Sequence, residues 1–213
     1  MNTFRRIVFA VFACLALAAP ALAHPHVWVT IKSELIYAPD GSVTGVRHAW
    51  TFDDMFSTFA LQGLAQKTKG QYTREELAPL AEVNVASLKE YDFFTYAKAD
   101  GEKAPFVEPK DYWLEYANSK LTLHFMLPLV KPAKARALEL EIYDVGYFVD
   151  FVLAEKDPVA LAGAPSACKL TLGRPQEMSF AQGKRLSEQA SNDPAVANNW
   201  GANFVNRISV TCP

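Results

Sequence analysis

The feature that most constrains the fold is an alternation of largely apolar and largely polar positions in residues 27–52, interrupted once by a turn. In the first half, one face of the segment carries Val27, Val29, Ile31, Ser33 and Leu35. In the second half, one face carries Val46, His48, Trp50 and Phe52. A side-chain period of two indicates β-strands, and the intervening APDGS at residues 38–42 supplies turn residues. We therefore predict a β-hairpin.

The apolar spacing becomes helical over residues 53–92. Residues 53–64 place their apolar side chains three to four positions apart, and Asp53 or Asp54 can cap this helix. A second helix begins with Thr73 and Glu76, the two ends of a capping box. Strand patterns return after residue 93, so we predict an α+β fold. Its body is β-rich and antiparallel, in two packed sheets, and residues 53–92 are a helical insertion.

The rest of the chain also reads as strands joined by tight turns. Hairpins are predicted around Asp100-Gly101 and Asn118-Ser119. Single strands are predicted at residues 137–144, 147–154, 168–173 and 206–212. Met178–Ala190 is polar with weak helical spacing. Without repeats or a long linker, residues 24–213 are predicted to form a single domain.

The first 23 residues have the organisation of a secretory signal peptide. Arg5 and Arg6 precede an apolar run, and Ala21-Leu22-Ala23 provides the small-x-small pattern of a cleavage site. We expect cleavage after Ala23 and a periplasmic location. The apolar run is too short for a convincing bilayer span, and no long apolar run follows it, so no span is expected after cleavage.

Cysteine usage agrees with an oxidising compartment. Cleavage removes Cys14 and leaves Cys168 and Cys212, which we expect to form one disulfide. The alternative is a pair of thiolate metal ligands, but the two cysteines lack CxxC spacing. A lipoprotein anchored at Cys14 is a further alternative; Phe12 fits that signal poorly.

Charge and motifs exclude several function classes. The formal net charge is −2 before Arg5 and Arg6 are removed, which argues against nucleic acid as a partner. The chain contains no G-x-S-x-G, no H-E-x-x-H and no reactive cysteine that would indicate a hydrolase. We expect a protein that is not an enzyme.

Residues 65–76 (AQKTKGQYTREE) resemble a calcium-binding loop that has lost its ligands. Gly70 and Glu76 occupy the glycine and bidentate-glutamate positions of the EF-hand template. The three early carboxylate positions are instead Ala65, Lys67 and Lys69. We predict an EF-hand-like helix pair that does not bind calcium; coincidental similarity is the alternative.

Two of the four histidines of the chain, His24 and His26, open the predicted mature protein. The α-amine of His24 titrates near neutrality and can bind a metal together with the imidazoles. Pro25 has no backbone N–H, which blocks the square-planar copper or nickel site of an Xaa-Xaa-His terminus. A histidine brace, formed by the amine and ring of His24 with a second histidine, stays open. A frayed terminus without function is the alternative.

The hairpin brings further donors towards this terminus. Pairing about a turn near residues 40–41 places His26 opposite residues 53–55, next to Asp53 and Asp54. The returning strand also carries His48, and a neighbouring strand carries His124. Imidazoles with a carboxylate favour Zn²⁺, Ni²⁺ or Cu²⁺. The alternatives are that His26 donates to a capping aspartate, that His48 is a buried neutral histidine and that His124 is an ordinary sheet residue.

The candidate metal ligands are therefore His24, His26, His48, Asp53 and His124, with Asp54 as an additional candidate.

Several segments together resemble the DUF1007 family, whose members are exported proteins described as periplasmic components of an uncharacterised transport system. These are HPHVWV at residues 24–29, RHAWTFDDMFSTFALQGL at 47–64, EIYDVGYFVDF at 141–151 and the closing NRISVTCP. The resemblance covers nearly all of the mature chain. It implies an association with nickel/cobalt-type or zinc-linked permeases, or with components of an ABC-type transporter in the inner membrane.

The chain departs from the family pattern in two places. Members often retain the D-x-N-x-D-G loop that is lost here at residues 65–69. The usual Y-D-P-x-Y-F is Tyr143-Asp144-Val145-Gly146-Tyr147-Phe148, without the proline, which leaves Asp144 as another candidate ligand.

From residues and resemblance together, the sequence predicts an accessory protein that binds a divalent transition metal, with zinc or nickel favoured, and exchanges it with an inner-membrane permease. Two alternatives remain: a domain that docks a partner without metal, and a copper oxidase of the histidine-brace type.

Overall fold

The computed structural model describes all residues except 1–25, 176–181, 183–184, 187, 190–191 and 198. The predicted signal peptide and His24 lie outside the described residues, as does most of Met178–Ala190. None of the helices in the described part of the chain has the length and apolar character needed to cross a membrane.

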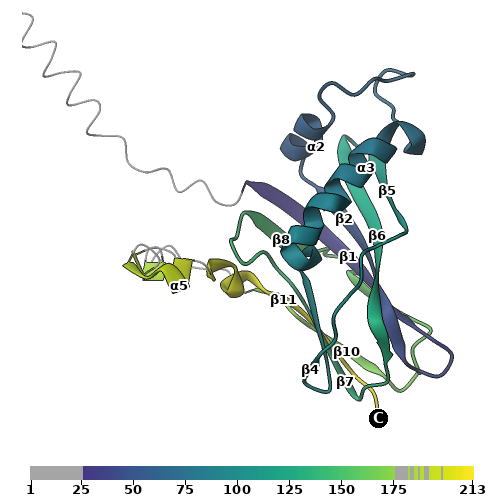
Figure 1. The fold of residues 1–213 in the computed structure, drawn as a ribbon, viewed down its shortest axis with the longest axis vertical. Helices are drawn as coiled ribbons and strands as arrows, with labels where there is room; N and C mark the ends of the chain where they lie inside the picture. Colours follow the sequence, from purple (N-terminus) through teal and green to yellow (C-terminus); the bar gives the residue numbers. More distant parts are fainter. Residues whose placement is uncertain (1–25, 176–181, 183–184, 187, 190–191, 198) are drawn as a thin grey trace, which may run out of the picture.

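Two β-sheets form the body of the molecule (Figure 1). The first sheet has the order β5-β6-β2-β1-β8, and β9 also pairs with β1. Its strands are β1 (Val27–Tyr37), β2 (Val43–Phe52), β5 (Tyr112–Ala117), β6 (Lys120–Ala133), β8 (Val149–Leu153) and β9 (Val159–Ala162). The second sheet has the order β10-β11-β7-β3-β4. Its strands are β3 (Thr95–Ala99), β4 (Glu102–Lys103), β7 (Ala137–Ile142), β10 (Lys169–Gly173) and β11 (Asn206–Thr211). The α+β prediction with two sheets and a helical insertion is confirmed.

The predicted first hairpin is also confirmed, in the expected register. Val29 of β1 lies opposite Phe52 of β2, and the inward-facing residues of both strands are buried. β1 makes its other pairings in parallel, with β8 along its first half and with β9 along its second half. The sheet is therefore mixed rather than wholly antiparallel, and β9 is a strand that the sequence pattern did not reveal.

The inserted helices lie at the end of the molecule where β1 begins (Figure 1). They are α2 (Asp54–Ala60), α3 (Arg74–Leu88) and the 3₁₀ helix η1 (Lys89–Phe94); α5 (Pro194–Ala197) and the 3₁₀ helix η2 (Trp200–Phe204) come later. Thr73 and Glu76 form the predicted capping box of α3. α3 packs against β5, and Ser57 of α2 accepts the Leu121 N–H of β6 at 2.9 Å. The insertion is thus joined to one side of the first sheet.

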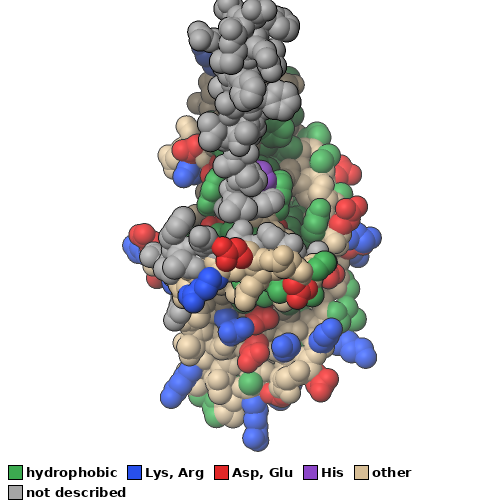
Figure 2. All heavy atoms as spheres, turned by 90° about the vertical axis from the view of Figure 1, so that its left-hand side faces the viewer, with side chains coloured by type: hydrophobic (Ala, Val, Ile, Leu, Met, Phe, Trp, Pro, Cys, Tyr) green, Lys and Arg blue, Asp and Glu red, His purple; other side chains and the backbone are tan. Residues whose placement is uncertain are grey.

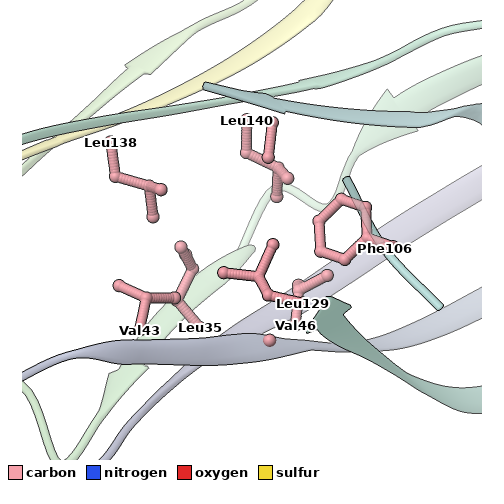
Figure 3. Close-up of a pocket in the computed structure, with 9 residues that line it drawn as sticks. Leu35, Val43, Val46, Phe106, Leu129, Leu138 and Leu140 are labelled. Carbon is pink, nitrogen blue, oxygen red and sulfur yellow. The ribbon is translucent and has the colours of Figure 1, made fainter. Parts of the chain in front are cut away.

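The inner faces of the two sheets share one apolar core. Figure 3 shows a small cavity between them, with Leu35, Val43 and Val46 facing Leu138 and Leu140 of the second sheet. The space is about 10 Å³, about what one water molecule occupies, and only apolar groups line it. This gap has no room for a small-molecule ligand.

Cys168 and Cys212 form the predicted disulfide. They flank the pair Lys169–Thr211, where β10 meets β11, so the bond closes the end of the second sheet. The cross-link spans a sequence separation of 44 residues, which restricts the unfolded chain considerably.

Reducing this disulfide, or replacing both cysteines with serine, is expected to lower the free energy of unfolding by about 2–4 kcal/mol, because the unfolded chain regains loop entropy. Urea unfolding with and without reductant measures this difference. An unchanged midpoint would show that the strand pairing alone holds this end together.

Candidate functional site

His26 is held where β1 begins. Its backbone N–H donates to the Phe148 carbonyl at 2.9 Å, and the two ring centroids are 4.6 Å apart. The imidazole is exposed on the outer face of the first sheet, because inward-facing Val27 follows it. Figure 2 shows a histidine, in purple, with hydrophobic side chains near it. The first described histidine therefore has a defined place on the sheet.

Asp53 lies close to this end of β1 but already has hydrogen-bond partners. One carboxylate oxygen caps α2 by accepting the Phe56 N–H at 2.8 Å, and the other accepts the Trp28 N–H at 2.9 Å. The predicted register continues here, since the Asp53 N–H donates to the Trp28 carbonyl at 3.0 Å. Asp54 points elsewhere, 3.7 Å from the Lys120 ammonium. The Asp53 carboxylate therefore first of all fixes the start of α2.

His48 is fully buried between the sheets. Its Nδ1 lies 2.9 Å from the Ser33 hydroxyl of β1, and its Nε2 lies 3.4 Å from the Thr95 hydroxyl of β3. The Thr95 hydroxyl also donates to the Phe93 carbonyl at 2.8 Å. Because that proton is already used, Nε2 must be the donor to Thr95, and Nδ1 the acceptor from Ser33. The ring thus relays hydrogen bonds from one sheet to the other.

This relay ends at a strained turn. Asp92, Phe93 and Phe94 all have left-handed backbone angles, with φ of 50°, 53° and 49°. Each such residue costs roughly 1–2 kcal/mol when it is not glycine. The Thr95 hydroxyl stabilises the turn by satisfying its carbonyl, at the point where the insertion returns to the second sheet. His48 is therefore placed to support the fold.

Burial lowers the pKa of His48 from its ordinary value of 6.5 to about 3. The cause is desolvation, which penalises the charged imidazolium. The groups around the ring are the hydroxyls of Ser33 and Thr95 and the rings of Trp50 and Phe125. A metal ion at His48 would have to displace the Ser33 hydroxyl from Nδ1, the nitrogen with the lone pair, and would need a path into the core.

His124 lies on the outer face of the first sheet, far from His26. Its ring stacks on Trp113 with centroids 4.7 Å apart, and its Nε2 is 3.3 Å from a Glu115 oxygen. Through Ala49, its place in the sheet is level with Lys32 of β1. Lys32 is six residues beyond His26, which corresponds to roughly 20 Å along the strand. A single ion cannot bind both imidazoles.

The last sequence candidate, Asp144, is buried, and both of its carboxylate oxygens accept backbone N–H groups of the following turn. Among the described residues, no group of three or more His, Cys, Asp or Glu side chains could hold a metal ion. The chain therefore does not gather the whole predicted ligand set. Of the described histidines, His26 alone adjoins the N-terminal segment that carries His24.

The degenerate calcium loop is closed by its own glutamate. The Glu76 carboxylate accepts the Lys67 N–H at 2.9 Å and the Thr73 N–H at 2.8 Å. Gly70 takes a φ of +76°, which suits glycine. In this arrangement the residue at the bidentate position organises the loop and caps α3.

Sequence reasoning missed the residues that hold the histidines. Ser33 could have been found, because it is a hydroxyl on an otherwise apolar strand face and such a residue needs a buried polar partner. Thr95 and Phe148 gave no signal, because their contacts join segments 47 and 122 residues apart in the sequence.

Fold and site together define a two-sheet, β-rich domain with an inserted helix pair and an anchored histidine at the start of β1. The chain belongs to the family described as "Protein of unknown function (DUF1007)", which matches residues 9–212.

A protein of Spirochaeta aurantia, named "Uncharacterized 15.5 kDa protein in trpE 3'region", is 29% identical over 93 residues. The alignment covers 43% of this chain and 66% of that protein. A solved structure, Biomphalaria glabrata acetylcholine-binding protein type 1, aligns over 97% of both chains with a TM-score of 0.39 and 10% identity.

The free energy of unfolding is expected to fall by about 2 kcal/mol between pH 7.5 and pH 5 through His48 alone. In this range the unfolded state binds a proton on His48 and the folded state does not. The contribution is complete above pH 6.5 and is lost as the pH falls towards 3. Urea unfolding of the wild type and of His48→Gln at both pH values isolates the effect, because the other titrating groups are shared. Equal losses in both proteins would contradict a neutral buried His48.

Proposed function

We propose that this protein is a non-enzymatic, periplasmic accessory protein that binds a divalent transition metal at its mature N-terminus and exchanges it with an inner-membrane transport system. Zinc and nickel fit the donors best, with copper as a third candidate. The ligands would be the imidazole of His26, the imidazole and α-amine of His24, and a nearby carboxylate or water. When bound, the ion is cargo, so the chain has only to hold and release it.

The observation that carries this proposal is the anchoring of His26. A histidine at a free chain end loses much conformational freedom when it binds an ion, and that loss weakens binding. Here the backbone bond to Phe148 and the ring contact already order residue 26. Its side chain is exposed, so a partner can approach it. An ordered but accessible imidazole is what a metal-exchange site needs.

The positions of the other candidate residues leave fewer ligands for the proposed metal site. His48 supports the core, and His124 lies too far away, so neither is included. Asp53 lies beside Trp28, two residues along the strand from His26, and both its oxygens already accept N–H groups. It contributes negative charge near the site, which favours a cation.

A second candidate function is docking of a protein partner without metal. It is favoured by α2, whose Met55 and Phe59 side chains are 65% and 69% exposed. They lie one helical turn apart and therefore on one side of the helix. Large exposed apolar side chains close together are typical of interaction sites.

Titration of the mature chain, with a mass that confirms a start at His24, tests the metal proposal. The ions are Zn²⁺, Ni²⁺, Co²⁺ and Cu²⁺. His26→Ala and a Gly-Ser extension before His24 are each expected to weaken binding about tenfold or more, since even residues that only orient a ligand have effects of this size. His124→Ala is the matched control and is expected to bind as the wild type does.

Binding should also weaken below about pH 6, because imidazoles must be neutral to act as ligands. Affinity that is constant down to pH 5, or equal in His26→Ala and wild type, would contradict the proposed site. Affinity no tighter than about 1 mM for all four ions would reject the metal function and favour partner docking.

A further inference from the structure

The turn before β8 is built around one buried carboxylate. Asp144 is 7% exposed, and its oxygens accept the N–H groups of Gly146, Phe148 and Val149 at 2.9, 2.8 and 2.9 Å. Hydrogen bonds to an ionised acceptor are stronger than those between neutral groups. The carboxylate therefore fixes the backbone of residues 144–149 from within.

The 3₁₀ helix η2 contacts the same turn from its other side. The Gly201 N–H donates to the Val145 carbonyl at 2.8 Å, and a Cβ at Gly201 would lie 1.5 Å from the Asp144 carbonyl oxygen. Only glycine allows this close approach. Tyr147 stacks on Phe204, with ring centroids 3.7 Å apart. The turn thus has support from both ends of the same 3₁₀ helix.

Phe148 is the residue through which this turn reaches the N-terminus. Its N–H is held by Asp144, and its carbonyl accepts the N–H groups of His26 at 2.9 Å and Val27 at 3.3 Å. Its ring contacts the His26 ring. The Asp144 carboxylate is therefore connected to His26 through the backbone and the ring of Phe148.

We propose that Asp144 is a positioning residue for the N-terminal histidine site: it sets the place of His26 through Phe148 and does not itself bind the ion. The effect on metal affinity rests on the proposed function, whereas the effect on the His26 ring does not. This role replaces the direct ligation that the sequence indicated for Asp144.

The test compares Asp144→Asn with Asp100→Ala in the full mature chain. In Asp144→Asn one of the two carboxylate oxygens becomes an NH₂ group, which faces at least one backbone N–H donor, and the negative charge is lost, so the three hydrogen bonds to the turn weaken. Asp100 is the control because its carboxylate also accepts two backbone N–H groups, from Arg136 at 3.0 Å and Ala137 at 2.9 Å. It lies in the β3–β4 turn, at the far end of the molecule from the N-terminus (Figure 1).

Two readouts separate positioning from general stability. The first is the NMR shift of the His26 ring protons, which the neighbouring Phe148 ring displaces; Asp144→Asn should move it towards the value of an unstructured histidine, and Asp100→Ala should not. The second is the affinity for Zn²⁺ and Ni²⁺, which Asp144→Asn should weaken about tenfold. Asp100→Ala should lower the unfolding midpoint without this change.

A wild-type ring shift in folded Asp144→Asn would overturn the positioning role. If the wild type binds no metal but its ring shift still responds to Asp144→Asn, the proposed function fails and the positioning role stands. Phe148→Leu covers the case in which Asp144→Asn does not fold, because the half-exposed Phe148 ring is removable. An unchanged metal affinity in Phe148→Leu, in a wild type that binds, would overturn the part of the path that depends on the Phe148 ring.

Discussion

The pairing of β1 on both of its edges is the interaction on which the rest of the molecule depends. One edge bonds to β2 in antiparallel register, and the other bonds to β8 and β9 in parallel. The inward face of β1 contributes Ser33 to the relay through His48, and its outward face begins with His26. One strand therefore connects the buried polar link between the sheets to the exposed His26, and it keeps the two on opposite faces.

This alternation explains why the predicted ligand set does not come together. In a strand, successive side chains point to opposite faces. Over residues 29–36, the register of β1 and β2 pairs each odd-numbered residue of β1 with an even-numbered residue of β2, as in Val29 and Phe52. The even-numbered residues of the two strands therefore point to opposite faces. His26 faces outward on β1, whereas His48 faces the core from β2. The face of His48 was readable from Val46, Trp50 and Phe52, but its neutral, relayed state depends on Thr95 of the other sheet. The distance between His26 and His124 depends on the order of the strands in the sheet, which the periodicity of single strands does not reveal.

Local physical chemistry made most elements predictable from the sequence. The Thr73–Glu76 capping box, the Asp53 cap and the positive φ at Asn118 and Ser119 all follow from residues close in sequence. The parallel pairing with β8 and the short β9 did not follow, because their partners are more than 100 residues away. The role of Asp144 was missed for a related reason, since a lone acidic residue before a glycine reads equally as a ligand or as the acceptor that shapes a turn.

The parallel pairing of β1 with β8 also sets when His26 can take its place as the chain is synthesised. The N-terminal end of a chain is made first, yet the carbonyl that holds His26 belongs to residue 148, and the glycine that supports its turn is residue 201. His26 consequently stays unplaced until almost the whole chain is available. Under the proposed function, His26 becomes a competent ligand only in a finished molecule, so incomplete chains would not compete with it for metal.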